Sequence, residues 1–139
     1  MEIKEHDSVS VIDPMEQMIR ENVNDNLIRA IDKLFILQLL SERDMYIKEI
    51  PPVVEKNTKG ISIGDPYSVI YALKDEGAVK PTRKMLANGR ERQYYAITPL
   101  GERRLEYTKK ALTDFTSGVN SLIKKSENRK KKNATEEGK

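Results

Sequence analysis

The sequence predicts a mainly α-helical fold with a single β-hairpin, in which helices precede the hairpin and one long helix follows it. Apolar residues recur at intervals of three and four through most of the chain. The pair Asn88-Gly89 separates two runs of extended character, which is the strongest short signal for a hairpin. A capping residue followed by proline occurs at Asp13-Pro14, Asp65-Pro66 and Thr98-Pro99, and each pair indicates a helix start.

Length and composition fit one domain without a membrane segment. The chain has 139 residues and a mass of 16.0 kDa, with 34% charged residues, 37% hydrophobic residues and a net charge of +3. A basic surface must therefore come from where the charges lie rather than from their sum. No apolar run approaches the ~20 residues that span a bilayer. No signal-peptide pattern opens the chain, so we expect a cytoplasmic location.

Few residues suit metal binding or covalent chemistry. The sequence has no cysteine, which excludes disulfides, thiolate zinc sites and cysteine nucleophiles. Its single histidine, His6, lies in a polar N-terminal segment. A glycine-rich phosphate loop and a helical pair of metal ligands are also missing from the sequence. We therefore expect no enzyme activity, no metal and no cofactor.

The N-terminal segment, residues 1–24, should contain one short helix that supports a dimer. Residues 1–12 carry no strong pattern and should fray, and the helix should begin after Asp13. Its apolar stripe is too narrow to hold the helix unless it docks on the rest of the domain or on a second subunit. The stripe consists of Met15, Met18, Ile19 and Val23.

A break at residues 24–26 should separate this helix from the most apolar part of the chain. Between Leu27 and Leu40, apolar residues cover too much of the helical wheel for a one-sided helix, so we expect the central buried helix here. Residues 45–57 should form the next helix. Within it, Pro51-Pro52 predicts either a kink or a helix that restarts at Pro51.

The stretch from Gly64 to Gly77 predicts one short helix with clear ends. Asp65 can cap its start, and Gly77 can adopt the left-handed conformation that ends a helix. With the two helices before it, this helix completes a helix-turn-helix pattern, and its outward side suits a DNA major groove. An ordinary surface helix is the alternative. The core-facing set is Val69, Ile70 and Leu73, and the outward set is Ser68, Tyr71 and Asp75, flanked by Tyr67 and Lys74.

A two-residue type I′ turn at Asn88-Gly89 should join strands over residues 78–86 and 91–97. Because side chains alternate along a strand, three arginines should then project from one face near the hairpin tip. In this register Arg90 lies opposite Ala87, Arg92 opposite Met85 and Tyr94 opposite Arg83, while Lys84 lies on the other face and Tyr95 and Ile97 turn toward the helices.

The final helix should run over residues 99–125 and carry a dimer interface. Its apolar residues alternate at spacings of three and four with one polar member, which is a heptad seam. A second copy of the chain is the simplest partner for such a seam, and folding back on its own domain is the alternative. Residues 126–139 should form a disordered basic tail. The seam consists of Leu105, Thr108, Leu112, Phe115, Val119 and Leu122.

These elements together describe a winged helix-turn-helix over residues 25–98, and its motifs resemble those of the PadR type of transcriptional regulator. The leucine-rich run from Ile36 to Glu42 is similar to that family's first helix. The run from Tyr94 to Gly101, Tyr-Tyr-Ala-Ile-Thr-Pro-Leu-Gly, is similar to its closing motif. The resemblance covers about residues 27–115. Its recognition-helix motif is matched at Gly64, Tyr67, Ile70, Leu73 and Gly77.

This resemblance implies a homodimeric regulator, usually a repressor, that binds a near-palindromic operator in double-stranded DNA. The recognition helix would contact base edges, while the wing and the loop before the helix would hold phosphates. The expected base contacts are Tyr67, Ser68, Tyr71 and Lys74. The expected phosphate or minor-groove contacts are Lys59, Arg83, Lys84, Arg90 and Arg92, with Asn88 and Gly89 shaping the wing tip.

Two alternatives stay open at this point. The predicted recognition helix and its ends, Gly64 to Gly77, contain three acidic residues and one basic residue, Lys74. This excess of acid favours a winged helix that binds another protein rather than DNA. These acids are Asp65, Asp75 and Glu76. A small-molecule effector would fit a dimer interface lined by Leu112, Phe115 and the helix of Met15 and Met18, but a constitutive repressor agrees equally well with the sequence.

Overall fold

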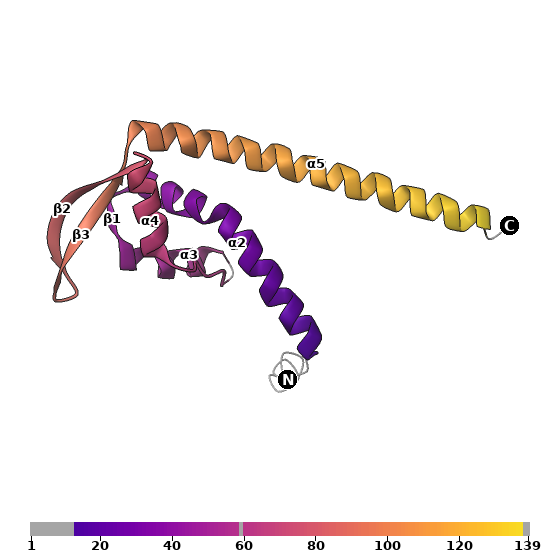
Figure 1. The fold of residues 1–139 in the computed structure, drawn as a ribbon, viewed down its shortest axis with the longest axis horizontal. Coiled ribbons are helices and arrows are strands. Elements are labelled where there is room, and N and C mark those ends of the chain that lie inside the picture. The colour runs from indigo at the N-terminus through magenta and orange to yellow at the C-terminus, as the bar shows by residue number, and fades with distance from the viewer. Residues whose placement is uncertain (1–12, 59, 138–139) are drawn as a thin grey trace.

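The computed structural model describes residues 13–58 and 60–137, so His6, Lys59 and the predicted frayed segment 1–12 lie outside the described part of the chain. The fold is mainly helical with a small antiparallel sheet, as predicted. Figure 1 shows the hairpin at one end and the helices α2 and α5 diverging from the compact part. The elements in order are α2 (Pro14–Glu42), β1 (Met45–Tyr46), the 3-10 helix η1 (Ile47–Glu49), α3 (Ile50–Asn57), α4 (Pro66–Asp75), β2 (Val79–Ala87), β3 (Arg90–Ile97) and α5 (Pro99–Glu137).

Helix α2 is continuous, so the predicted break at residues 24–26 is wrong. The carboxylate of Asp13 caps the helix by accepting a hydrogen bond from the Met15 backbone N–H at 3.3 Å, as expected. No proline or glycine interrupts the helix. The Asn26 amide donates to the Asn22 side chain one turn earlier at 3.4 Å, so its donor is used within the helix. The narrow apolar stripe and the core-forming residues therefore share one helix.

Only the C-terminal half of α2 is the buried helix that the sequence predicts. Ile36, Leu37 and Leu40 are buried there, whereas Leu27 is 59% exposed. Ile28 is also buried and Ile31 is half-buried, so Leu27 is the apolar residue at the start of the predicted helix that faces solvent in the single chain.

The segment from Met45 to Asn57 is not one helix. Met45 and Tyr46 form the short strand β1, which pairs with Tyr95 and Tyr94 of β3. Helix α3 begins at Ile50 with Pro51 and Pro52 in its first turn, where a missing backbone N–H costs no helical hydrogen bond. The prediction that a helix restarts at the prolines is therefore confirmed, while the strand before it was missed.

Strands β2 and β3 form the predicted hairpin in a sheet of order β1-β3-β2. Positive φ angles of 53° at Asn88 and 76° at Gly89 confirm the type I′ turn. Tyr94 does not lie opposite Arg83 in the ladder, because the register shifts between Pro81 and Lys84. Proline lacks the N–H that a regular ladder needs, and the Thr82 hydroxyl donates instead to the Tyr94 carbonyl at 3.2 Å. The other two predicted pairs, Ala87 with Arg90 and Met85 with Arg92, are confirmed.

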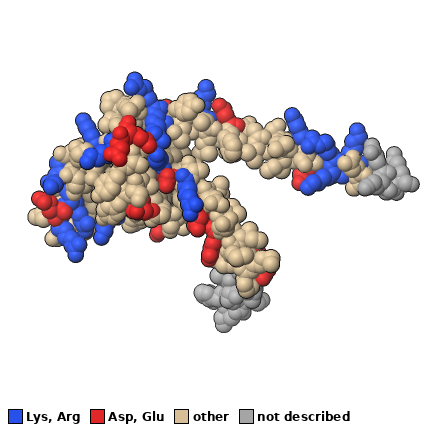
Figure 2. Space-filling view, in the orientation of Figure 1, with Lys and Arg blue, Asp and Glu red and all other residues tan. Residues whose placement is uncertain are grey.

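Helix α5 does not end near Lys125 but continues to Glu137. The residues after Lys125 include no glycine or proline before Glu137, and lysine, arginine and alanine favour a helix. Lys130 also pairs with Glu127 at 3.6 Å on the helix surface. Figure 2 shows Lys and Arg side chains gathered on the far part of this helix.

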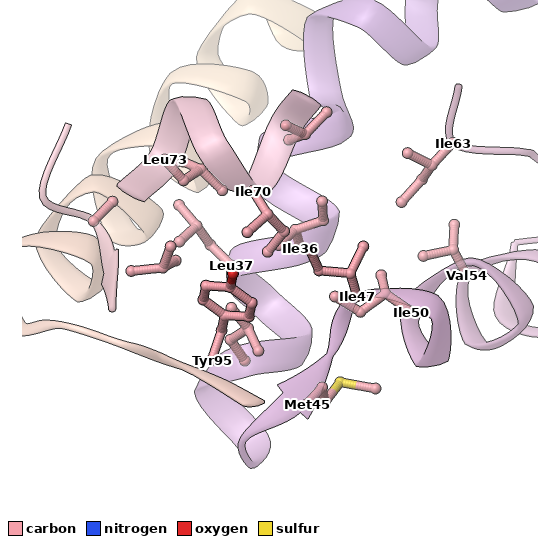
Figure 3. Packing of buried hydrophobic residues seen from close by; sticks show 14 of the residues in the cluster. Ile36, Leu37, Met45, Ile47, Ile50, Val54, Ile63, Ile70, Leu73 and Tyr95 are labelled. Carbon is pink, nitrogen blue, oxygen red and sulfur yellow. The ribbon is translucent and has the colours of Figure 1, made fainter. Parts of the chain in front are cut away.

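The core brings together residues from every helix and from the sheet. Figure 3 shows Ile36 and Leu37 of α2 close to Ile70 of α4, with Tyr95 of β3 beside them. Leu105 of α5 is only 3% exposed and belongs to this core. The prediction that Leu105 belongs to a dimer seam is therefore corrected, because its own domain buries this side chain. The largest fully buried side chains are Ile36, Leu37, Ile50, Ile70 and Leu73.

The start of α5 is fastened to the end of α4. The Thr98 hydroxyl donates to the Gly77 carbonyl at 2.6 Å and accepts from the Gly101 N–H at 3.0 Å, which caps α5. Gly77, with φ +82°, ends the stretch from Gly64 to Gly77 in the left-handed conformation, as predicted. A Cβ added at Gly101 would collide with the carbonyl oxygen of Ala78, so only glycine allows this close approach.

Candidate nucleic-acid interface

Helix α4 presents a defined outward face. The Asp65 carboxylate accepts from the Tyr67 N–H at 3.0 Å and from the Ser68 hydroxyl at 2.6 Å, which fixes the first turn. The pKa of Asp65 is below its usual value of 3.8, and the hydrogen bond from the Ser68 hydroxyl is the largest cause of this shift. Val69, Ile70 and Leu73 are buried as predicted. The helix is thus anchored by its apolar side, and its polar side faces solvent.

The predicted base contacts divide between two places. Tyr67 and Tyr71 lie side by side with ring centroids 6.4 Å apart, and both are exposed. Lys74 is exposed one turn further along. Ser68 instead lines a hollow against Ile28 of α2, and its hydroxyl proton is already donated to Asp65. The structure therefore brings Tyr67 and Tyr71 together and places Ser68 to one side of them.

A hollow of about 200 Å³ lies between α4, η1 and β3. It joins three segments that are far apart in sequence. Lys48 comes from η1, the two tyrosines come from α4, and Arg92 comes from the hairpin. The complete lining is Tyr46, Ile47, Lys48, Tyr67, Tyr71, Glu91, Arg92, Gln93 and Tyr95.

Two of the hairpin arginines rest on aromatic rings. The guanidinium of Arg83 lies 4.7 Å from the centre of the Tyr94 ring and pairs with Asp44 at 2.9 Å. The guanidinium of Arg92 lies 5.2 Å from the centre of the Tyr46 ring. Both arginines are therefore held on the same side of the sheet in spite of the register shift, because cations are attracted to the faces of aromatic rings.

The hairpin tip carries further basic residues and is connected to β1. Arg90 and Lys84 are exposed. Lys84 lies opposite Gln93 in the strand register, and because side chains alternate along a strand, it projects from the face opposite Arg92. The Asn88 amide donates to the Tyr46 hydroxyl at 3.0 Å. Figure 2 shows basic side chains over the hairpin at the left of the view. The turn residue Asn88 thus shapes the tip and also attaches it to the sheet edge.

Most of the acid in the recognition stretch is used within the chain. Glu76 pairs with Lys33 of α2 at 2.7 Å and with Arg104 of α5. The Lys33 hydrogen bond is the largest cause of a pKa for Glu76 below its ordinary value of 4.5. Asp65 is the helix cap, which leaves Asp75 as an acid exposed on α4. The unpaired negative charge around α4 is therefore smaller than the sequence suggests.

Sequence reasoning missed Tyr46 and Lys48 as site residues. Both lie in a segment expected to be helical, where neither would be placed beside the hairpin. The available signal was the two prolines after Ile50, which push the helix start downstream and leave residues 45–49 free to pair or turn.

Apart from the buried Leu105 and the half-buried Thr108, the predicted dimer residues lie on two exposed apolar faces of the single chain. Thr108 is half-buried and donates to the Arg104 carbonyl at 2.7 Å, while Phe115 is 70% exposed. A hollow of about 510 Å³ with an almost entirely apolar lining lies between α2 and α5. Leu27, Ile31, Leu112 and Phe115 are among its lining residues. The remaining exposed members are Met15, Met18 and Ile19 on α2, and Leu112, Val119 and Leu122 on α5.

Over residues 13–58 and 60–137, no helix is both long enough and apolar enough to cross a bilayer.

Comparison with known proteins gives a consistent result. The model of the transcriptional regulator PadR-like family matches residues 36–107. The chain is similar to a transcriptional regulator from Clostridium thermocellum, with 25% identity, a TM-score of 0.62, and coverage of 69% of this chain and 96% of that one. It is also similar to a PadR-like transcriptional regulator from Bacillus cereus, with 25% identity, a TM-score of 0.60, and coverage of 70% and 96%.

A PadR family transcriptional regulator from Eggerthella lenta shares the fold, with 20% identity, a TM-score of 0.67, and coverage of 77% of this chain and 94% of that one. No curated protein matches the chain.

Proposed function

Because this chain belongs to the PadR-like family of transcriptional regulators, we propose that it is a homodimeric repressor that binds a near-palindromic DNA operator. The observation that carries this proposal is the surface shared by α4, η1 and the hairpin. There Tyr67 and Tyr71 lie beside Arg92 and Lys48 around one hollow. A helix that offers polar and aromatic groups next to a basic wing is the arrangement with which winged helices hold DNA.

The α4 side chains would contact base edges in the major groove. Tyr67 and Tyr71 offer hydroxyl groups that donate and accept, and Lys74 offers a cation suited to guanine. Ser68 would act as an acceptor only, since its proton is held by Asp65. Base discrimination at this helix would therefore depend mainly on the two tyrosines and Lys74.

The wing would supply the phosphate contacts. Arg90 and Lys84 are exposed at the tip, and Arg92 faces the hollow. Arg83 is already paired with Asp44, so its share of the binding energy would be smaller than that of an unpaired arginine. Lys59 remains an expected phosphate contact, although it lies outside the described residues.

A second copy of the chain would cover the exposed apolar faces of α2 and α5. Burial of such residues is the main driving force for stable association. The two recognition helices would then lie about one DNA turn, ~34 Å, apart. For a ligand-responsive repressor, we place the effector in the apolar hollow between α2 and α5, which suits a small apolar molecule.

The alternative of a protein-binding winged helix has less support. It rests on the acidic residues of the recognition stretch, and Asp65 and Glu76 are engaged in a helix cap and in ion pairs. The exposed Asp75 alone gives little reason to prefer a basic protein partner over DNA.

A binding titration tests the proposal. The protein is titrated onto the DNA upstream of its own gene, and onto a scrambled duplex of equal length, at two salt concentrations. We expect tighter binding to the upstream DNA and weaker binding to both duplexes at the higher salt. If the protein retards neither duplex in a gel at low salt, DNA binding is refuted.

A further inference from the structure

The hollow between η1, α4 and β3 contains two cations that are free to meet an anion. Arg83 and Arg104 both form ion pairs, with Asp44 and Glu76. Within the described part of the chain, neither Lys48 nor Arg92 forms a salt bridge, although both line this hollow. Positive charge is therefore available on its two walls.

Arg92 is partly prepared for such a contact. Its guanidinium is held over the Tyr46 ring, and its Nε atom is shielded from solvent without a hydrogen-bond partner in the described residues. A shielded donor without an acceptor costs free energy. Because the Nε atom is shielded, an incoming oxyanion would instead meet the terminal Nη groups, which make the paired hydrogen bonds that a guanidinium forms with phosphate.

Tyr46 determines where Arg92 lies. Its backbone is fixed in β1 opposite Tyr94, and its N–H donates to the Glu49 carboxylate at 3.2 Å. Its ring packs edge-on against Tyr94 at 5.4 Å and carries Arg92 on its face. Its hydroxyl accepts from Asn88 at the hairpin turn. One side chain thus connects the sheet edge, the wing tip and the arginine.

We propose that Lys48 and Arg92 close on a single backbone phosphate of the DNA, with Tyr46 as the positioning residue that holds Arg92 for this contact. This inference rests on the proposed function and deepens it. The volume of about 200 Å³ suits one phosphate group rather than a base pair. Glu91 also lines the hollow and opposes the anion, so Glu91→Gln should strengthen binding to every duplex.

The first experiment measures how binding depends on salt. Lys48→Ala, Arg92→Ala and the double variant are titrated against the upstream DNA and the scrambled duplex, with Lys110→Ala on exposed α5 surface as the matched control. We expect each single variant to weaken binding to both duplexes alike. The double variant should flatten the plot of log affinity against log salt by about one unit, since one phosphate is lost.

Two results would overturn the shared phosphate. An unchanged slope in the double variant would mean that neither cation contacts a phosphate. Flattening by about two units would mean two separate phosphates. The affinity loss of the double variant should also differ from the product of the single losses by about twofold or more, as expected for groups that share a partner.

The second experiment tests the positioning role of Tyr46. Tyr46→Phe keeps the ring beneath Arg92 and should bind within about twofold of the wild type. Tyr46→Leu removes the ring and should lose about as much affinity as Arg92→Ala, with little further loss when the two are combined. If Tyr46 had a purely structural role, Tyr46→Leu would instead weaken binding equally in the wild-type protein and in the Arg92→Ala variant. If Tyr46→Leu does not fold, a loss for Tyr46→Phe comparable to Arg92→Ala would overturn the role of the ring.

These outcomes separate the two proposals. Wild-type protein that binds no duplex at low salt would refute both the proposed function and the phosphate contact. Wild-type protein that binds with an ordinary salt slope, unchanged in the Lys48 and Arg92 double variant, would refute the phosphate contact alone.

Discussion

Alanine at Gly101 should destabilise the protein, whereas alanine at Gly118 in the same helix should stabilise it. Both residues lie in α5, so alanine gains helix propensity over glycine at both, by up to about 1 kcal/mol. At Gly118 the added Cβ meets nothing within 4 Å, so this gain should be observed. At Gly101 the Cβ would collide with the Ala78 backbone, which cannot rotate away as a side chain would.

Forcing a methyl group into a well-packed site typically costs about 1–3 kcal/mol. After the full propensity gain is subtracted, we expect Gly101→Ala to lower the free energy of unfolding by up to about 2 kcal/mol, with Gly118→Ala changing it in the opposite direction. The assay is urea unfolding followed by circular dichroism at two or more protein concentrations, because dimerisation would add a concentration-dependent contribution. A Gly101→Ala variant as stable as Gly118→Ala would refute the close contact between α5 and the end of α4.

Three further predictions concern charge and assembly. Arg90→Ala should weaken binding to all duplexes and flatten the salt slope by about one unit, and an unchanged slope would remove Arg90 from the phosphate contacts. Because ion pairs lower the pKa of Glu76, its stabilising effect should be present above pH 4.5 and disappear as the pH falls through the lowered pKa. Wild type and Glu76→Gln should therefore converge in thermal stability at acidic pH, and a constant difference would contradict this. Phe115→Glu should convert the dimer to a monomer, as measured by the mass from light scattering. A variant that stays dimeric would contradict an interface formed by α5.

The sequence was sufficient for those elements whose ends are set by local chemistry. Asp13, Asp65 and Thr98 cap helices because their side-chain oxygens reach the first free N–H groups, and that geometry depends only on neighbouring residues. The turn at Asn88-Gly89 is equally local, since both residues tolerate positive φ. Nearest-neighbour chemistry therefore predicted most of the winged helix.

Errors arose where distant contacts determine the outcome. Tyr46 extends as a strand because β3 offers it a pairing partner almost fifty residues away, and no local pattern encodes that partner. Leu105 fits the heptad spacing of α5 but is buried by the core of its own domain. The negative charge of Glu76 is likewise offset by Lys33 and Arg104, which come from other helices. The composition of the candidate site therefore required the tertiary structure.

The fastening of α5 to the end of α4 turns the long helix into a lever arm. With 39 residues, α5 is about 58 Å long at 1.5 Å per residue. A tilt of only 5° at its fastened end would sweep its far end through about 5 Å for a helix of that length. Conversely, a partner that fixed the far part of α5 would restrict the tilt of α5 at its attachment to the end of α4 to a narrow range of angles. In the proposed dimer, small changes in the angle at which two α5 helices cross would then change the spacing between the two α4 helices, which are the proposed recognition helices.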